Sequence, residues 1–317
     1  MNSPRTQDTK RPRVDGTDMT ATSYNTHNAD SGPSVSNRGS RSPAKLLTVN
    51  EFTLVSMNIA GCHPSKEAPR GWGQQDATEA ITNELLRTDP DVLALQECPG
   101  GADWASRWFP GYQVQGATYS HVDQVMLLVR DGIHSEAQEG HNLPAVMAKL
   151  TIEEGREFLI ASVHLEPFRE GKRDRLRQMK SLIQTAQKRN IPLVIAGDTN
   201  MRVAEDSSME NLLHLVDLWK QSGTGNATKW TWDTKDHGTH FNRYYGDSTR
   251  EYVARYDRVY VWQPPPPPPV ASTSSCTQGS QAAVTVQSFE LLANQPVSNK
   301  FHFLSDHFGI SVTFQLK

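Results

Sequence analysis

The sequence around Asp198 most constrains what this chain can fold into. Residues 191–196 read Ile-Pro-Leu-Val-Ile-Ala, a short apolar run that is typical of a buried strand, and Gly197, Asp198 and Asn200 follow it. A buried strand cannot solvate a carboxylate, so Asp198 must lie where the strand ends. Gly197 lets the backbone turn there and lets a ligand approach. An acid and an amide two residues apart suit the activation of water beside a phosphate, and a turn that favours Gly, Asp and Asn is the alternative.

The composition excludes several classes of protein. The 317 residues carry a formal charge of −3 at pH 7, so we expect any nucleic-acid contact to be confined to a cleft. The cysteines Cys62, Cys98 and Cys276 show no paired spacing, which argues against a disulfide framework or a thiolate zinc site and indicates a reducing interior. The chain has no apolar run long enough to span a bilayer and no apolar secretory core at its start, so no membrane contact is expected.

Two low-complexity segments accompany one predicted folded domain, residues 46–317. Residues 1–45 are polar and should form a disordered tail, and their basic cluster at residues 10–13 is either a nuclear import signal or chance charge. Residues 264–282 interrupt the domain between two predicted strands. The run Pro264–Pro269 would form a polyproline II rod of about 19 Å. It is either a ligand for a proline-binding module or a solvated loop.

Apolar runs elsewhere in the domain predict two sheets. The expected strands are 52–57, 91–95, a short run near Gln113, 125–129, 146–152, 157–163, 193–196, 255–261, 284–292 and 308–314. Helices are expected at 77–86, 103–108 and 173–188, and the last has an apolar stripe with its charges on the opposite side. Many strands with few long helices indicate an α/β (α+β) fold in which two sheets pack face to face with helices outside.

Polar side chains recur where these strands end. They are Asn58, Glu97, His164, Asp198 with Asn200, and Asp306 with His307, while Asp257 lies near the start of its strand. Each has an ordinary explanation alone: His164 could be a satisfied core histidine, and Asp306 could cap a helix. Their recurrence in this order is much more specific than any single member.

These segments resemble the endonuclease/exonuclease/phosphatase superfamily. The matching motifs are Ser56-Met57-Asn58, Leu95-Gln96-Glu97, Val163-His164-Leu165, Gly197-Asp198-Thr199-Asn200, Asp257-Arg258-Val259 and Ser305-Asp306-His307. The resemblance extends from about Leu46 to the C-terminus. It implies a DNase I-like four-layered sandwich, with two packed, mainly antiparallel sheets flanked by helices.

Further segments are similar to one branch, the tyrosyl-DNA phosphodiesterase 2 family. They are Asn58-Ile59-Ala60-Gly61, His164-Leu165-Glu166, Asn200-Met201-Arg202, Val216-Asp217-Leu218-Trp219, Thr231-Trp232-Asp233-Thr234 and Tyr256-Asp257-Arg258-Val259. Members release a topoisomerase tyrosine from the 5′ end of a DNA break. The chain departs from the pattern at Ala60, where the family usually has Asp. This loss could weaken a metal contact or relax the loop, but the other acids remain and we expect activity.

The hypothetical mechanism gives each residue a role around one phosphate. Glu97 would be the main metal ligand, with Asn58 and Asp306 supporting it, and hard oxygen ligands suit Mg²⁺, with Mn²⁺ as the alternative. Asp198 would orient and deprotonate the attacking water, and Asn200 would fix that water or a phosphate oxygen.

His164 and His307 would donate to phosphoryl oxygens as charge grows, and Asp257 would hold His307 in its charged state. The substrate-binding residues implied by the resemblance are Asn58, Arg169, Arg202, Trp232 and Tyr256. The two arginines would meet phosphates, and the aromatic pair would line the cleft against the terminal nucleotide. A core or surface position in a long loop is the alternative for Trp232.

The expected function is therefore a Mg²⁺-dependent phosphodiesterase acting on 5′-phosphotyrosyl-DNA left by abortive topoisomerase 2 action. It would act as a monomer in double-strand break repair, in the nucleus, with the cytoplasm as the alternative. A second hypothesis is another hydrolase of the superfamily, acting on RNA ends, abasic DNA or a phospholipid. A third is a catalytically silent adaptor that uses the polyproline segment, against which the intact acids and histidines argue.

Overall fold

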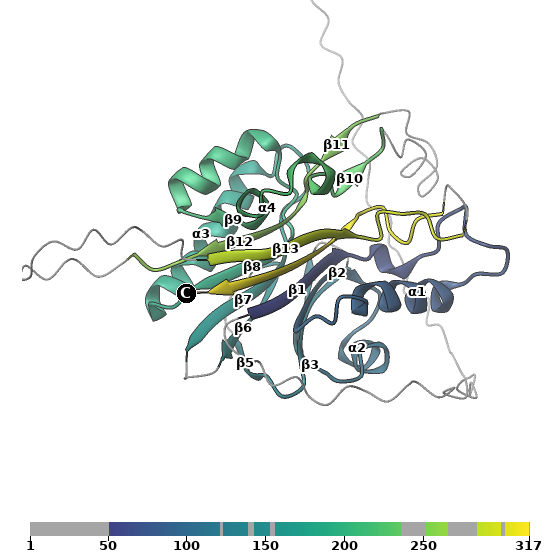
Figure 1. Cartoon of the computed structure of the whole chain (residues 1–317), viewed down its shortest axis with the longest axis horizontal. Helices are drawn as coiled ribbons and strands as arrows, with labels where there is room; N and C mark the ends of the chain where they lie inside the picture. The colour runs from purple at the N-terminus through teal and green to yellow at the C-terminus, as the bar shows by residue number, and fades with distance from the viewer. Residues whose placement is uncertain are drawn as a thin grey trace, which may run out of the picture. The chain divides into compact units, whose positions relative to one another are not determined.

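Two six-stranded sheets organise the part of the chain that the computed structural model describes (Figure 1). That part comprises residues 51–120, 123–138, 143–152, 156–235, 251–265, 284–298 and 302–316. The first sheet has the strand order β13 (Val284–Leu292), β14 (Gly309–Leu316), β1 (Glu51–Asn58), β2 (Val92–Cys98), β4 (Asp123–Arg130), β3 (Tyr112–Ser120). The second has the order β5 (His134–Gln138), β6 (Ala145–Thr151), β7 (Glu157–His164), β8 (Leu193–Asp198), β12 (Asp257–Trp262), β9 (Val216–Asp217).

Helices and short turns complete the described elements. The α-helices are α1 (Gln74–Leu86), α2 (Ala102–Trp108), α3 (Lys172–Arg189) and α4 (Leu218–Ser222). Single turns lie at Ala60–Cys62, Val203–Glu205, Ser208–Leu212 and Gly225–Thr228. A separate two-stranded ribbon joins β10 (Trp232–Asp233) to β11 (Val253–Ala254).

Each large sheet is built around one parallel pair. β1 pairs with β2, and β7 with β8, in parallel, and the described pairings to their neighbours are antiparallel. A parallel pair needs a long crossover, which α1 and α3 supply. The carboxyl ends of parallel strands meet at one edge, so Asn58 lies opposite Gln96, and His164 opposite Asp198.

Antiparallel neighbours bring their amino ends to this same edge. β12 runs against β8 and places Asp257 opposite Asp198. β14 runs against β1, with Ile310 opposite Ser56, so the segment just before β14 reaches the end of β1. This topology explains why the polar residues follow some strands and precede others.

The layers are helix, sheet, sheet, helix, as expected. The inner faces of the sheets share one apolar core, in which Phe52 of β1 meets Phe158 of β7 edge to face at 5.5 Å. The outer face of the first sheet packs on Ile81 and Leu85 of α1, and that of the second on the apolar stripe of α3 (Figure 1). The predicted α/β sandwich is confirmed, and both sheets are mixed because a helix links each central pair.

The long helix differs from its prediction in one side chain. α3 buries Met179, Leu182 and Ile183, as its stripe predicts, and ends at Asn190 with a left-handed φ of 54°. Charges were expected opposite this stripe, but Arg175 is fully buried. A buried guanidinium needs a partner, and Glu205 provides it with Arg175 Nη2 at 2.7 Å from Glu205 Oε1.

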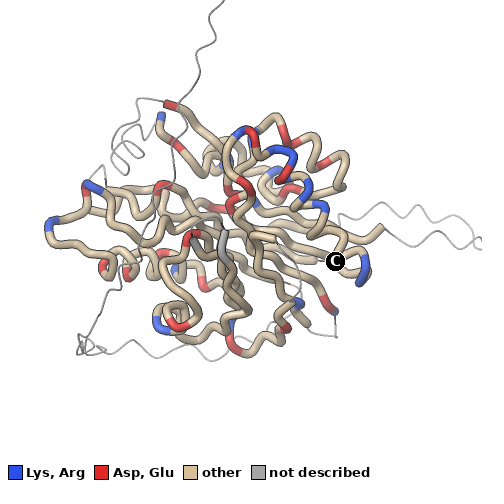
Figure 2. Tube along the Cα trace, turned by 180° about the vertical axis from the view of Figure 1, so that it is seen from behind, with Lys and Arg blue, Asp and Glu red and all other residues tan. Residues whose placement is uncertain are grey.

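Two predicted features lie outside the described residues and stay predictions: the 1–45 tail with its basic cluster, and residues 266–282 of the insertion. Within the described ranges, no helix has the length and apolar character needed to cross a bilayer. Lys and Arg lie interspersed with Asp and Glu along the described trace (Figure 2). Any attraction for an anionic ligand must therefore come from local groups.

Candidate active site

The ends of four central strands bring Asn58, Glu97, His164 and Asp198 together. Asn58 Nδ2 donates to Glu97 Oε1 at 2.8 Å and to Asp198 Oδ2 at 3.3 Å. His164 Nε2 lies 4.0 Å from Glu97 Oε1 and 3.5 Å from Asp198 Oδ2. Two residues come from each sheet, so the cluster spans the junction between the sheets at one edge of the sandwich.

The backbone is unusual at the strand ends. Glu97 and Asn200 have φ values of 53° and 50°, in a region that residues other than glycine seldom occupy. Gly197 has φ 143°, and a Cβ there would lie 2.0 Å from the carbonyl oxygen of Val163. Residues held in such conformations cluster at functional sites, where the surrounding structure stabilises them.

Asp198 is the centre of the cluster. Its side chain is buried, and its Oδ1 accepts a hydrogen bond from Asn200 N at 2.8 Å. Its Oδ2 is approached by Asn58 Nδ2, by His164 Nε2, and by His307 Nε2 at 3.8 Å. One carboxylate oxygen is therefore fixed by backbone and the other faces three nitrogen-bearing side chains.

His307 and Asp257 form a buried pair beside Asp198. His307 Nδ1 lies 2.8 Å from Asp257 Oδ2. Burial alone would lower the pKa of His307, but the carboxylates of Asp257, Asp198 and Asp306 outweigh it and raise that pKa well above its ordinary value. The raised pKa favours the charged ring, whose Nε2 faces the Asp198 side.

Aromatic rings wall this pair. The Trp232 ring meets His307 edge to face at 5.1 Å, and the Tyr256 ring centroid is 6.2 Å from that of His307. The guanidinium carbon of Arg202 lies 4.7 Å from the Tyr256 ring centroid. Trp232 and Tyr256 are only 8% and 7% exposed, so most of their surface contacts protein. Their nucleotide-binding roles stay predictions.

Asn200 and Arg202 continue the chain beyond β8. Asn200 Nδ2 donates to Leu165 O at 3.1 Å, which ties the β8 end to the segment after β7. Arg202 Nη1 donates to Asn200 O at 2.8 Å. Arg169 is exposed between β7 and α3, outside the hydrogen-bonded cluster of the described residues, so its phosphate contact also stays a prediction.

A known protein family matches most of this chain. The model of the Endonuclease/Exonuclease/phosphatase family matches residues 55–307. The chain belongs to this family. The matched span contains the whole cluster described above, from Asn58 at the end of β1 to His307.

Individual relatives are about one quarter identical to this chain over the aligned residues. The chain is 26% identical over 280 residues to tyrosyl-DNA phosphodiesterase 2 of Danio rerio, covering 84% of this chain and 67% of that protein. It is 25% identical over 302 residues to 5′-tyrosyl-DNA phosphodiesterase of Caenorhabditis briggsae, covering 89% and 75%. The match to the Gallus gallus protein covers 58% of this chain and 51% of that protein, so the alignment spans about half of that relative's length.

Solved structures share the fold. Danio rerio TDP2 complexed with single strand DNA product matches with a TM-score of 0.61 at 20% identity, covering 84% of this chain and 99% of that one. Truncated Caenorhabditis elegans TDP2 matches with a TM-score of 0.60 at 22% identity, covering 84% and 97%. The human Nocturnin catalytic domain also matches, with a TM-score of 0.56 at 19% identity, over 84% and 94%.

The donor set fits a divalent cation at Glu97 and Asp306. Burial raises the pKa of Asp306 to about 6, and the nearby carboxylates of Glu97 and Asp198 add to this against the attraction of His307. Acids that repel one another in this way gain most from a cation, and carboxylate oxygens suit Mg²⁺ or Mn²⁺. A divalent cation would be held by these two side chains, and their role as its ligands stays a prediction.

Two other proposed ligands fit less well. Asn58 Oδ1 accepts a hydrogen bond from Ala60 N at 3.1 Å, so its amide nitrogen faces the carboxylates and its metal role stays a prediction. Asp198, Asp257 and His307 also place ligand atoms within 4.8 Å of one another. A charged imidazole cannot ligate a metal, so we assign this group to hydrogen bonding.

Two hydroxyl groups hydrogen-bond to the backbone of the site residues, and the sequence analysis did not predict them. Thr231 Oγ1 accepts from the backbone N–H groups of Tyr256 and Asp257, each at 3.1 Å. Ser305 Oγ donates to Asn58 O at 2.8 Å. Both residues lie inside quoted motifs, but a hydroxyl in a turn gives no separate signal.

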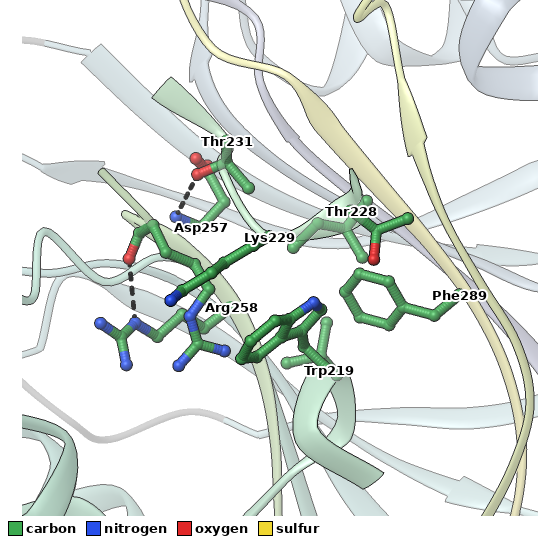
Figure 3. Close-up of a pocket in the computed structure, with 10 residues that line it drawn as sticks. Trp219, Thr228, Lys229, Thr231, Asp257, Arg258 and Phe289 are labelled. Carbon is green, nitrogen blue, oxygen red and sulfur yellow. Dashed lines mark hydrogen bonds between the residues drawn. The ribbon is translucent and has the colours of Figure 1, made fainter. Parts of the chain in front are cut away.

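A narrow pocket lies behind Asp257 (Figure 3). Its wall includes Trp219, with the Arg255 guanidinium carbon 4.8 Å and Lys229 Nζ 5.5 Å from the ring centroid. Arg258 Nε donates to Arg255 O at 3.0 Å, a bond drawn in Figure 3. The side chains that line this pocket pack against β12, and the pocket adjoins the catalytic cluster through Asp257, the partner of His307.

Proposed function

We propose that this chain is a metal-dependent 5′-tyrosyl-DNA phosphodiesterase. The observation that carries the proposal is the convergence of Asn58, Glu97, His164, Asp198 and His307 on one point. The names of the relatives supply the substrate class. An adaptor would have no need of this polar cluster, which is costly to bury.

Asp198 would accept the proton of the attacking water. Its Oδ1 is fixed by Asn200 N, so Oδ2 is presented at a set position beside His164 and His307. Water would attack phosphorus in line with the tyrosyl oxygen, and the phosphorus–oxygen bond to tyrosine would break. The products are a 5′-phosphate end and a tyrosine residue.

Imidazole and amide donors would stabilise the transition state. Charged His307, held by Asp257, would donate its Nε2 proton to a phosphoryl oxygen, and His164 would do the same from the opposite sheet. A cation at Glu97 and Asp306 would neutralise phosphate charge when bound. A phenol has a pKa of about 10, so tyrosine leaves with less help than an alcohol.

We also propose the specific substrate, the cation and the cellular process. The substrate would be DNA ends left by topoisomerase 2, the cation Mg²⁺, and the setting double-strand break repair in the nucleus. The basic cluster at residues 10–13 supports the last point. A fusion of the chain to a fluorescent protein, with and without neutralising substitutions at Lys10, Arg11 and Arg13, tests it.

Substrate choice is tested on matched oligonucleotides. Wild type and Asp198→Asn are assayed with Mg²⁺ on a 5′-phosphotyrosyl oligonucleotide, an abasic duplex, an RNA 5′ end and a phospholipid. We expect the wild type to release tyrosine and Asp198→Asn not to. The control variant Asp103→Asn, which changes an exposed acid, should release tyrosine at the wild-type rate. Turnover of another substrate without tyrosine release would replace this proposal with a different hydrolase activity, and equal turnover by Asp198→Asn would remove Asp198 from the mechanism.

A further inference from the structure

Phe168 combines exposure with backbone strain beside the active site. Its side chain is 72% exposed, more than the other large apolar residues found exposed in the described ranges. Single exposed apolar residues are common and mean little alone. Phe168 also has φ 62°, which is a true outlier for a bulky residue. Something must hold the backbone in this conformation.

A buried arginine holds it. Arg175 Nη1 donates to Phe168 O at 2.6 Å and to Glu166 O at 2.7 Å. Gly171 packs directly beneath, because a Cβ there would lie 2.5 Å from Pro167 O. Arg175 and Gly171 therefore fix the loop after β7, in which Leu165 is buried while Phe168 is left exposed.

The same arginine ties this loop to the end of β8. Arg175 Nε and Nη2 donate to the two oxygens of Glu205 at 3.1 and 2.7 Å. Glu205 Oε1 in turn accepts from Arg202 N at 3.0 Å. One buried ion pair thus sets the positions of Phe168 and Arg202 relative to each other.

Both loops start at the catalytic cluster. Leu165, next to His164, donates its N–H to Asp198 O at 2.9 Å and accepts from Asn200 Nδ2. Phe168 comes three residues later, and its exposed ring lies outside the buried cluster. A substrate part that reaches it must extend beyond the scissile phosphate.

The surroundings of the ring favour a nucleic-acid strand over a polypeptide. Arg169, Lys172 and Arg173 are exposed and follow it within five residues in the chain, with one exposed acid, Glu170, among them. Aromatic faces among cations bind single strands by stacking on bases while the cations meet phosphates. This arrangement gives binding without sequence preference.

We infer that Phe168 stacks on a nucleobase of the substrate strand, and that Arg175 with Glu205 is the positioning pair that presents it. The inference rests on the proposed function for the substrate class. It adds a residue that contacts the substrate strand and the ion pair that positions this residue.

Binding is tested without turnover. A 5′-phosphorylated single-stranded oligonucleotide with a fluorescent 3′ end is titrated with wild type, Phe168→Gly and Phe168→Trp. Phe168→Gly should weaken binding on the order of tenfold, Phe168→Trp should preserve it, and Phe168→Gly should raise Tm because glycine tolerates φ 62°. The matched control is His214→Gly, an exposed residue with φ 53° on the segment before β9, which should raise Tm and leave binding unchanged. Equal affinity of Phe168→Gly and wild type would overturn the inference.

Steady-state kinetics distinguish contact of Phe168 with the DNA strand from contact with the attached peptide. They also test the positioning pair. On an oligonucleotide carrying a single 5′-tyrosine, Phe168→Gly should raise KM on the order of tenfold with kcat unchanged. Replacing bases one at a time by abasic positions should abolish this difference at the contacted base. A penalty that appears only when a longer peptide replaces tyrosine would assign the ring to the protein side and overturn the inference.

Arg175→Lys keeps the charge but loses the fork that reaches three groups at once. Assayed well below its own Tm, it should raise KM by a larger factor in the wild-type background than in Phe168→Gly, where only its effect through Arg202 is left. Independent effects would overturn the positioning role. Because the binding test needs no cleavage, its failure is distinct from failure to release tyrosine, which would count against the proposed function alone.

Discussion

Asn58 and Asp198, 140 residues apart, are joined by a hydrogen bond of 3.3 Å that crosses from one sheet to the other. Asn58 also donates to Glu97 Oε1, so one amide group lies between two carboxylates. Carboxylates brought this close repel each other, and a shared donor offsets that repulsion. The bond therefore couples the packing of the sheets to the electrostatics of the site.

Replacing Asn58 should damage catalysis more than folding. In Asn58→Ala the carboxylates of Glu97 and Asp198 lose their common donor, and we expect kcat to fall on the order of 10²-fold or more. Steady-state kinetics on the tyrosyl oligonucleotide measure this, with exposed Asn83→Ala on α1 as the control. Asn58→Asp should be at least as impaired, since it adds a third negative group. Wild-type kcat in Asn58→Ala would contradict this account.

Glu97 should govern metal affinity. Glu97→Gln removes one charged oxygen from the pair formed with Asp306, and we expect Mg²⁺ and Mn²⁺ to bind at least ~10-fold more weakly. Calorimetric titration of the metal alone gives the affinity, and kinetics at varied metal concentration give its effect on rate. The exposed acid Glu136 supplies the control, because Glu136→Gln should titrate like wild type. If Glu97→Gln binds metal normally, the cation lies elsewhere in the cluster.

The pH dependence should follow the charge of His307. Its pKa is raised above the ordinary value, so the charged form, and the activity that needs it, is present at neutral pH and is lost as pH rises through the raised pKa. Asp257→Asn removes the carboxylate at 2.8 Å, so the pKa of His307 should fall and the alkaline limb of kcat should move to lower pH. Asn still accepts a hydrogen bond, so the ring should stay in place. An unchanged alkaline limb would show that another group sets it.

The pair of His307 and Asp257 also stabilises the fold, and this stabilisation decreases with rising pH as the activity does. A histidine whose folded pKa is raised stabilises the fold fully below its unfolded pKa, and this contribution is lost as pH rises through the folded pKa. The Tm difference between wild type and Asp257→Asn should therefore be larger at pH 6 than well above the raised pKa of His307. Thermal melts across this range measure it.

Four of the site residues that could be predicted from sequence share one property. Each follows an apolar run that predicts a buried strand, so a polar residue at its end stands out in the sequence. They are Asn58, Glu97, His164 and Asp198. Arg175 shows the limit of this reasoning. It lies in an amphipathic helix among exposed charges, and its burial depends on Glu205, thirty residues later in the chain. Periodicity cannot reveal a partner that only the fold brings near.

Short elements were missed for a related reason. β9, β10 and β11 have two residues each, too few for a strand pattern to appear. They form because longer neighbours offer pairing, as β12 does for β9. Thr231 precedes β10 and supports Asp257 through backbone hydrogen bonds, so its role depends on a register that local sequence does not contain.

Gly197 should be intolerant of any side chain, although it touches no substrate. It combines φ 143° with a position where a Cβ would lie 2.0 Å from Val163 O and 2.9 Å from Val163 N, in the central pairing of β7 with β8. Backbone atoms of a buried strand cannot move aside cheaply, so Gly197→Ala should cost about 3 kcal/mol or more of the free energy of unfolding. The matched control is Gly132→Ala, which also has a positive φ, 92°, but no atom within 4 Å of the added carbon, and should cost only about 1–2 kcal/mol. Chemical denaturation of both variants measures the difference. Equal losses would mean that the strand pair can open to admit a methyl group, and the fixed position of Asp198, on which the proposed chemistry depends, would then need another explanation.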